Sequence, residues 1–165
     1  LMTKIHNLYV QVAFIIFASV FTSLLFNQLR NESLPFLRAK VEVVSSLPSL
    51  KAKSSGSHIT GIDLELAKKL FEENTLFVDA RAEEFYNEGH IPNAICFDDF
   101  DLLVEKLENT IGMDDQFIVY CSDSDCGSSE DLSYELQSHG YNNILLFKGG
   151  WKEWTDANLI QAKYE

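Results

Sequence analysis

A long uncharged run opens the hydrophobic pattern of this chain. From Leu8 to Phe26 the sequence contains no charged residue and no proline. As a helix at about 1.5 Å per residue, this run reaches about 28 Å, close to the thickness of a bilayer's hydrocarbon core. The flank Asn27–Arg30 offers no small-residue cleavage site of the kind that follows a secretory signal. The pattern therefore predicts an uncleaved N-terminal membrane anchor, residues 1–29, with a spanning helix over about 8–28.

The stretch after this anchor has no sustained period. Residues 30–57 contain Pro35, Pro48 and a serine-rich run at 54–57. Sequence of this composition without periodicity is typical of a linker. We therefore expect residues 30–57 to connect the anchor to a folded domain over residues 58–162.

From residue 58 onward, short apolar runs alternate with helical patterns. Thr60 and Asp63 have the spacing of a helix-capping box, and apolar residues at helical spacing follow them. Continuously apolar strands that alternate with helices are typical of a parallel sheet covered on both faces. The fold class is therefore predicted to be α/β. The predicted strands are 76–78, 94–97, 117–120 and 144–147, and the predicted helices include 64–71, 102–107, a helix from Ser128 that ends at Gly140, and a last short helix with Trp151 and Trp154.

The charge balance narrows the range of partners. Asp and Glu number 25 against 13 Lys and Arg, which gives a formal net charge of −12. Such a chain repels phosphate backbones, so nucleic-acid binding is not expected. Lys4 precedes the apolar run, whereas Arg30, Arg38 and Lys40 follow it. The positive-inside rule then weakly favours a cytoplasmic domain on a single-pass membrane protein.

One loop has the residues and the position for chemistry. The strand 117–120 runs directly into Cys121–Ser128, and a helix begins there. Ligands bind at the carboxyl ends of parallel strands, where loop amides and a helix N-terminus supply positive potential. A cysteine at the start of such a loop has its thiolate favoured, and the thiolate is the form that attacks sulfur. Cys121 is therefore the candidate nucleophile.

Several motifs in a fixed order resemble the rhodanese family over residues 58–160. The resemblance implies a five-stranded, mostly parallel sheet with the cysteine loop at its carboxyl edge. It also implies sulfurtransfer, in which Cys121 takes sulfane sulfur from a small donor, carries it as a persulfide and passes it to a thiol acceptor. It implies no metal and no cofactor, and it makes residues 122–127 the backbone cradle. The motifs are Asp79-Ala80-Arg81, Glu84-Phe85, Gly89–Ala94, Val119–Cys121, Gly140-Tyr141 and Gly149–Trp151 with Trp154.

The loop departs from the family pattern in its charge. Family sulfurtransferases place a basic residue just before the helix, where this chain has Cys126 or Gly127. A carboxylate close by opposes a thiolate and repels an anionic donor such as thiosulfate. The loop is also longer than in those enzymes, as in related phosphatases and arsenate reductases, but it lacks the Arg that their chemistry uses. The other loop residues are Ser122, Asp123, Ser124, Asp125, Gly127 and Ser128, with two carboxylates and no cation.

The second cysteine of the loop leaves two interpretations open. Cys126 lies five residues after Cys121, and the two sulfurs come within bonding reach if the Cβ vectors agree. Cys126 would then act as a resolving thiol that releases the product and leaves a disulfide. The alternative is that Cys126 packs under the start of the helix.

Other ionisable residues of these motifs have structural interpretations. In the family, the positions of Asp79, Arg81, Glu84 and His90 hold loops beside the sheet, and the same role is expected here. His90 has no second ligand at metal-binding spacing, and a metal bound by the loop thiols and carboxylates is not expected. Cys96 lies in an apolar run and is expected to be an inert core residue.

These features support three function hypotheses. The leading one is a membrane-anchored sulfurtransferase or thiol relay that works through a Cys121 persulfide. The second is a non-catalytic binding or regulatory module recruited to an integral membrane protein, which the acidic loop favours. The third is a dithiol redox protein that uses Cys121 and Cys126. A Cys121→Ser change separates the first two, because an enzyme loses turnover and a docking module keeps its partner.

Overall fold

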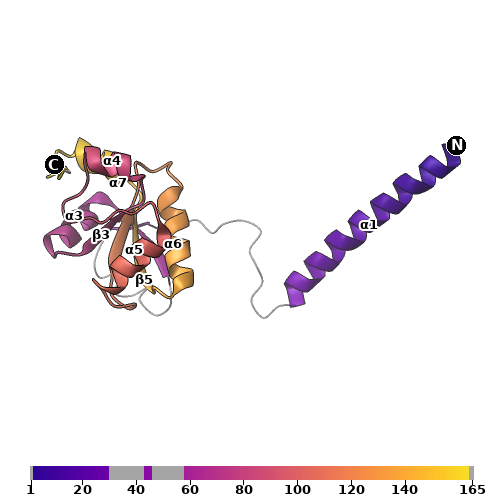
Figure 1. Ribbon diagram of the computed structural model, residues 1–165, viewed down its shortest axis with the longest axis horizontal. Helices are drawn as coiled ribbons and strands as arrows, with labels where there is room; N and C mark the ends of the chain where they lie inside the picture. Colours follow the sequence, from indigo (N-terminus) through magenta and orange to yellow (C-terminus); the bar gives the residue numbers. More distant parts are fainter. Residues whose placement is uncertain (1, 30–42, 46–57, 164–165) are drawn as a thin grey trace. The chain divides into compact units, whose positions relative to one another are not determined.

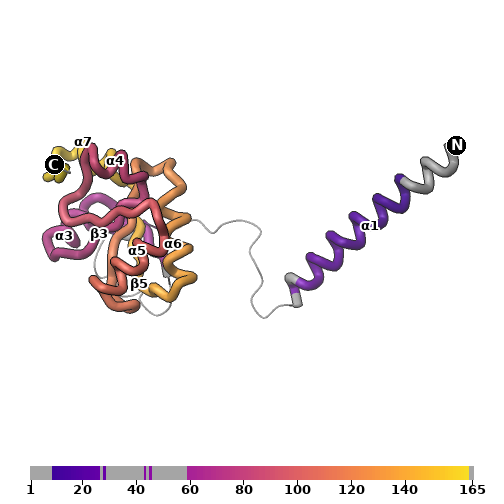
Figure 2. The backbone as a smooth tube through the Cα atoms, in the orientation of Figure 1, coloured from indigo at the N-terminus to yellow at the C-terminus, as the bar shows by residue number. Residues whose placement is uncertain are grey.

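The computed structural model describes residues 2–29, 43–45 and 58–163. The chain divides into two compact units, Leu1–Lys40 and Val41–Glu165. Among its described residues, the first unit is a single helix, and the second is an α/β domain (Figures 1 and 2).

The N-terminal unit contains the helix α1, Met2–Leu29. Its segment Tyr9–Phe26 is strongly apolar. Apolar side chains lie on all sides of the helix, as expected of a segment with no aqueous face. The hydroxyls of Ser19 and Thr22 donate to backbone carbonyls four residues earlier, at 2.8 and 2.9 Å, so these polar groups are satisfied within the helix. The helix is therefore long and apolar enough to span a membrane, a test that a signal sequence also passes.

The domain is built on a five-stranded parallel sheet with strand order β1-β2-β5-β4-β3. The pairing of β4 with β3 and β5 places Tyr120 beside Asp79 on one side and Phe147 on the other. The carboxyl end of β4, where the cysteine loop begins, therefore has a neighbouring strand on each side. The predicted α/β class and parallel sheet are confirmed. The strands are β1 Val43–Val44, β2 His58–Ile62, β3 Leu76–Asp79, β4 Phe117–Tyr120 and β5 Asn143–Phe147.

Helices cover both faces of the sheet, as predicted (Figure 1). Strand residues alternate between the two faces: Ile118 and Tyr120 pack with α3 and α7, whereas Phe117 and Val119 pack with α5 and α6. Gly140 ends α6 with φ 113°, a left-handed conformation that glycine adopts without strain. The helices are α3 Leu64–Glu72, α4 Glu83–Glu88, α5 Phe100–Glu108, α6 Ser128–His139 and α7 Gly150–Asp156.

The predicted linker, residues 30–57, contains the edge strand of the sheet. Val43 and Val44 pair in parallel with Gly61 and Ile62 of β2, so the sheet begins before the predicted boundary at residue 58. Two adjacent valines are too short a run to show an alternating pattern, which is why no sequence pattern indicated this strand. Residues 30–42 and 46–57 lie outside the described residues.

Two other predicted elements differ from the structure. Thr60 lies inside β2, and the cap of α3 is Asp63, whose Oδ1 accepts a hydrogen bond from the amide of Leu66 at 3.0 Å. Residues 94–97 do not form a strand. Ile95 alone makes a bridge to β3, at Val78, before the chain turns toward α5. A β-branched residue in a short apolar run gives the same sequence signal for a bridge as for a strand.

Candidate functional site

Cys121 follows β4 directly, and its backbone is held by the start of α7. The amide of Trp151 donates to the carbonyl oxygen of Cys121 at 2.8 Å, and the amide of Lys152 donates to that of Ser122 at 2.8 Å. Gly150 has φ +59°, and a Cβ at this position would lie 2.3 Å from the Cys121 carbonyl oxygen. Only glycine therefore allows the two segments to approach so closely.

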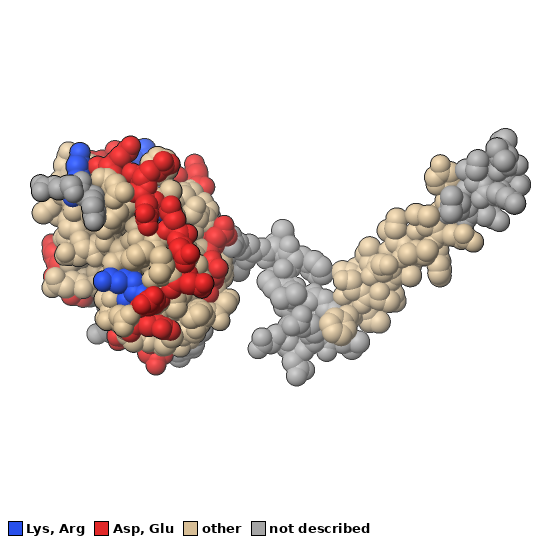
Figure 3. Space-filling view, viewed as in Figure 1, with Lys and Arg blue, Asp and Glu red and all other residues tan. Residues whose placement is uncertain are grey.

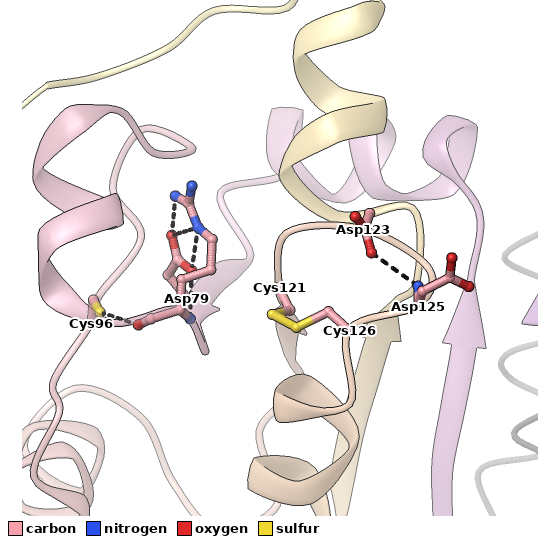
Figure 4. The surroundings of a disulfide bond; sticks show 7 residues. Asp79, Cys96, Cys121, Asp123, Asp125 and Cys126 are labelled. Atoms are coloured by element: carbon pink, nitrogen blue, oxygen red, sulfur yellow. Dashed lines mark hydrogen bonds and ion pairs between the residues drawn. A yellow bond between two sulfur atoms is a disulfide. The ribbon is translucent and has the colours of Figure 1, made fainter.

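A disulfide joins Cys121 to Cys126 across the loop, with a Cα–Cα distance of 6.2 Å (Figure 4). The separation is within the normal range for a disulfide. The structure thus brings together the two cysteines whose relation the sequence left open, and Cys126 does more than pack under the helix. Cys121 is 3% exposed, whereas Cys126 is half-buried.

Asp123 shapes the loop between the two cysteines. Its Oδ1 accepts a hydrogen bond from the amide of Asp125 at 3.0 Å, and its carbonyl oxygen accepts one from the amide of Cys126 at 3.3 Å. In this disulfide form, two of the amides predicted to form the backbone cradle bond within the loop. Ser124 is exposed and Asp123 is half-buried.

The start of α6 lies directly after Cys126. Gly127 is the N-cap residue, and glycine has no side chain to bond the first-turn amides. Amides at a helix start carry partial positive charge and favour a nearby thiolate. Ser128 begins the helix, and the acidic Glu130 and Asp131 follow in the first turn, which offsets part of that positive potential.

Charge around the loop is negative on the described part of the domain. Lys148 pairs with Glu130 at 2.5 Å, and Lys152 pairs with Asp156 at 2.5 Å. The hydrogen bond with Asp156 raises the pKa of Lys152, with a smaller contribution from Asp123, so this lysine stays protonated. Both lysines near the loop therefore have a carboxylate partner. Acidic side chains also form a band over the face that carries α5 and α6 (Figure 3).

A buried ion pair lies at the end of the neighbouring strand, β3. The Arg81 guanidinium bonds Asp79 through Nε at 3.0 and 3.1 Å and through Nη2 at 2.6 Å. The same Nη2 donates to the carbonyl oxygen of Gly89 at 2.7 Å. Tyr120 donates its hydroxyl to Asp79 Oδ2 at 2.6 Å and accepts from the amide of Ile91 at 3.2 Å. This cluster ties the segment at Arg81 and the segment Gly89–Ile91 to the ends of β3 and β4.

The net pKa shifts of Tyr120 and Arg81 in this cluster are both upward. Burial, followed by the carboxylate of Asp79, raises the pKa of Tyr120 well above its ordinary value. Burial lowers the pKa of Arg81, but the hydrogen bond and charge of Asp79 outweigh it, so the net shift is upward. The tyrosine therefore stays neutral and the arginine stays charged. Neither group is available as an acid or a base near neutral pH.

His90 and Glu84 occupy different surroundings. The His90 ring stacks on Tyr86 with centroids 3.7 Å apart, and Nδ1 lies 2.8 Å from the Tyr86 carbonyl oxygen. Because a carbonyl oxygen only accepts, Nδ1 carries the proton. The backbone of His90 also exchanges two hydrogen bonds with Ala162, at 2.9 Å each, which fixes the C-terminal segment. Glu84 lies exposed on α4, outside the buried cluster.

Cys96, the third cysteine, is buried and free. Its thiol donates to the carbonyl oxygen of Arg81 at 3.1 Å. Burial, followed by the charge of Asp79, raises the pKa of the thiol to about 12. A thiol with such a pKa is neutral at physiological pH and is a poor nucleophile. This environment fits the predicted inert role.

Among residues 2–29, 43–45 and 58–163, no group of three or more His, Cys, Asp or Glu side chains could hold a metal ion.

Three contributions to the site were missing from the sequence analysis. The sequence indicates Trp151 as part of a motif and of the last helix, but not that its amide holds the Cys121 carbonyl or that its ring centroid lies 4.9 Å from the Arg81 guanidinium carbon. Gly150 was part of the same motif without an assigned role. Tyr120 was treated as an apolar strand residue, although a buried tyrosine hydroxyl usually has a partner, and that rule could have pointed to Asp79.

The parallel sheet and the cysteine at the end of β4 define an α/β domain with a thiol-based site. A family model described as the rhodanese-like domain matches residues 63–157. The chain therefore belongs to the rhodanese-like domain family, as the resemblance in its motifs indicated.

Solved structures with the same fold include three bacterial proteins. Thiosulfate sulfurtransferase from Pseudomonas aeruginosa is 21% identical with a TM-score of 0.55, and the match covers 66% of this chain and 21% of that one. The Alr3790 protein from Anabaena sp. is 21% identical with a TM-score of 0.53, covering 62% and 82%. The 3-mercaptopyruvate sulfotransferase SseA from Escherichia coli is 21% identical with a TM-score of 0.50, covering 60% and 48%. At these identities the likeness concerns the fold.

Proposed function

We propose that this domain is a sulfurtransferase of the thiol-relay type, in which Cys121 carries sulfane sulfur and Cys126 resolves the persulfide. The observation that carries the proposal is the bond between Cys121, at the carboxyl end of β4, and Cys126, at the start of α6. Two sulfurs that reach bonding distance in the folded loop can exchange a bond without unfolding.

The first step loads the sulfur. The Cys121 thiolate attacks the sulfane sulfur of a donor persulfide, R–S–SH, and forms Cys121–S–SH while the donor leaves as a thiolate, R–S⁻. The uncapped amides at the start of α6 favour negative charge on the loop sulfurs. An acceptor thiolate can then attack the outer sulfur and become a persulfide, while the sulfur–sulfur bond breaks and Cys121 leaves as a thiolate. Alternatively, Cys126 reacts with the persulfide.

The second step resolves the persulfide. The Cys126 thiolate attacks Sγ of Cys121, the sulfur–sulfur bond of the persulfide breaks, and sulfide leaves with the electron pair as HS⁻. The product is the Cys121–Cys126 disulfide. A dithiol reductant must then return the loop to its reduced form, because the disulfide holds two oxidising equivalents.

We also propose that α1 anchors the domain to a membrane. Its apolar length and its internally bonded hydroxyls support this assignment. That the domain faces the cytoplasm and that its partner is an integral membrane protein are predictions from the sequence.

The test is intact-mass analysis of the 165-residue chain, kept in detergent and reduced before a persulfide donor is added. Cys126→Ser should gain about 32 Da, one sulfur, which cyanide removes. The parent chain should instead lose about 2 Da as it forms the disulfide and releases sulfide. Cys96→Ala is the matched control and should behave as the parent. An unchanged mass of the folded Cys126→Ser variant would contradict sulfurtransfer.

A second candidate is a dithiol redox protein without sulfur uptake, which the disulfide itself favours. This protein would exchange disulfides with partners and would ignore persulfide donors. In the experiment above it predicts no sulfur adduct on Cys126→Ser, together with a normal titration of the disulfide in the parent chain. The two candidates therefore give opposite results on one variant.

A further inference from the structure

The two sulfurs of the loop differ in their access to solvent. Cys121 is 3% exposed, whereas Cys126, just before α6, is half-buried. In Figure 4 the disulfide lies over the first turn of α6, and Asp123 and Asp125 lie on the side of the loop away from the disulfide. A thiolate that opens a disulfide attacks one sulfur in line with the S–S bond, so access decides which sulfur it attacks. Of the two residues, Cys126 is the more accessible.

The surroundings of Cys126 are acidic. Asp125 precedes it and is exposed, and Asp123 is tied to the same turn. Beyond it, Asp131 Oδ2 lies 4.0 Å from the position that a Cβ on Gly127 would occupy. The segment 121–128 has no cation, and Lys148 and Lys152 already have carboxylate partners. An anionic thiol reagent therefore meets repulsion here, and a cationic one meets attraction.

A cavity of about 460 Å³ adjoins the outer side of the loop. Asp123 and Ser124 line the cavity on the side of the loop. The ion pair of Lys152 with Asp156 also lines the cavity. Its acidic lining includes Asp63 and Glu153, so carboxylates outnumber ammonium groups in the cavity. A positively charged group bound in this cavity would lie beside the turn that ends at Cys126.

We propose that the Cys121–Cys126 disulfide is opened at Cys126 by a dithiol reductant that carries positive charge beside its reactive thiol. This inference rests on the proposed function, in which the relay ends each cycle as this disulfide. The reductant thiolate bonds to Sγ of Cys126, the disulfide breaks, and the electron pair leaves on Sγ of Cys121. The second thiol of the reductant then displaces Cys126, which leaves both loop thiols reduced and the reductant oxidised.

In this scheme each cysteine of the loop reacts with one external thiol compound. Cys121 exchanges with the sulfur donor when the loop is open, and Cys126 exchanges with the reductant when the loop is closed. The buried Cys121 then leaves as the thiolate that the next cycle needs. Electrons and sulfur thus enter the same loop through different atoms.

The charge requirement is tested with three small thiols of similar size: cysteamine, 2-mercaptoethanol and 2-mercaptoethanesulfonate. Reduction of the oxidised full chain is followed at low salt, and each rate is expressed per thiolate to remove differences in thiol pKa. The cationic thiol should exceed the anionic one by on the order of tenfold, and high salt should reduce this ratio. Equal rates, or a faster anion, would overturn the proposal.

A double variant tests whether the loop carboxylates cause that preference. Asp123→Asn with Asp125→Asn removes both charges, while the new amide side chain at position 123 keeps an oxygen that can accept the hydrogen bond of the turn from the backbone amide of residue 125. This variant should bring the three rates together. Glu72→Gln with Glu73→Gln is the matched control, since it removes the same charge from exposed residues at the far end of α3. A preference that survives the first variant, or disappears in the second, would contradict the assignment.

The attacked atom is identified by quenching the reaction with an alkylating agent and locating the modifications by fragment-ion mass spectrometry. The cysteamine adduct should lie on Cys126, with the alkyl group on Cys121. The reverse arrangement would overturn the proposal. Sulfur uptake by Cys126→Ser does not involve this step, so failure here and failure of the proposed sulfurtransfer are seen in different measurements.

Discussion

Two adjacent strands of the sheet end in opposite kinds of polar site. At the end of β3, Asp79 and Arg81 are buried and bonded to each other, to Tyr120 and to the carbonyl oxygen of Gly89. At the end of β4, the cysteine loop is tied down by its backbone at Cys121, whereas its outer side chains face solvent. Both sites carry ionisable groups at the carboxyl edge, where ligands bind in folds of this type.

The difference between the two sites lies in what their polar atoms already bond. The guanidinium and carboxylate of the β3 site make their hydrogen bonds with one another and with the backbone, so they fix loops and leave little for a substrate. The sulfurs of the β4 site bond each other, and that bond is the one that chemistry can open. The raised pKa values of Arg81, Tyr120 and Cys96 therefore reflect a structural site at β3, whereas the sulfurs that we propose as the reactive groups lie at β4.

Removal of the Arg81 side chain should give the largest effect, and this effect should be a loss of stability. Arg81→Ala leaves the Asp79 carboxylate buried without its cation, so we expect the free energy of unfolding to decrease by about 3–5 kcal/mol. Urea denaturation of the folded domain measures this change. Arg81→Lys keeps the charge but loses the two-point geometry, and it should lose less stability.

The two sites would not be separate in function if the Arg81 guanidinium took part in sulfur transfer directly. An Arg81→Lys chain that remains folded should load sulfur on Cys121 at close to the parent rate. A loss of sulfur uptake well beyond its loss of stability would place the guanidinium at the reacting atoms, contrary to the separation of the two sites.

A methyl group added at Gly150 should give an intermediate effect, and this effect should be on the conformation of the cysteine loop. The new Cβ would meet the Cys121 carbonyl oxygen, and a left-handed φ of +59° is strained for alanine. We expect Gly150→Ala to cost about 1–3 kcal/mol and to slow re-formation of the disulfide after reduction. The rate of thiol loss during air oxidation measures the second effect.

Gly127→Ala is the control for this substitution, because it adds the same methyl group within the cysteine loop itself, away from the close approach at Gly150. There a Cβ meets nothing closer than Asp131 at 4.0 Å, and the glycine has φ −79°. Its effect on stability should stay within about 0.5 kcal/mol. Equal slowing of disulfide formation in both variants would show that the close approach at Gly150 does not position Cys121.

The sequence predicted the features that depend on local pattern. Apolar runs indicated β3, β4 and β5, helical spacing indicated α3 and α6, and the motifs indicated the family and the nucleophile. The edge strand at Val43–Val44 was missed because a two-residue strand has no period, and Thr60 was misplaced because a β-branched residue before an acidic one fits both a strand end and a cap.

Features that depend on the direction of side chains or on contacts between distant segments could not be predicted. The pairing of Cys121 with Cys126 required the direction of two side chains within a loop, which spacing alone does not give. The bond from Trp151 to Cys121 joins residues thirty positions apart, through a turn that only the folded sheet brings into place. The same holds for the hydroxyl of Tyr120, whose partner Asp79 is set by the register of β3 and β4.

The smallest expected effect concerns Cys96. It lies beside the β3 site, but its side chain is a thiol like those of the β4 site. Its thiol bonds the Arg81 carbonyl oxygen and has a pKa raised to about 12, so it should resist alkylation at pH 8 while reduced Cys126 reacts. Because the folded pKa exceeds the unfolded value, this group stabilises the fold fully below pH 9, and its contribution is lost as the pH rises toward 12. Cys96→Ala should therefore flatten the fall in stability over that pH window, with almost no change at pH 7 beyond the loss of packing. Alkylation of Cys96 as fast as Cys126 in the folded chain would show that burial at β3 does not silence a thiol, and the contrast between the two strand ends would then rest on the loop alone.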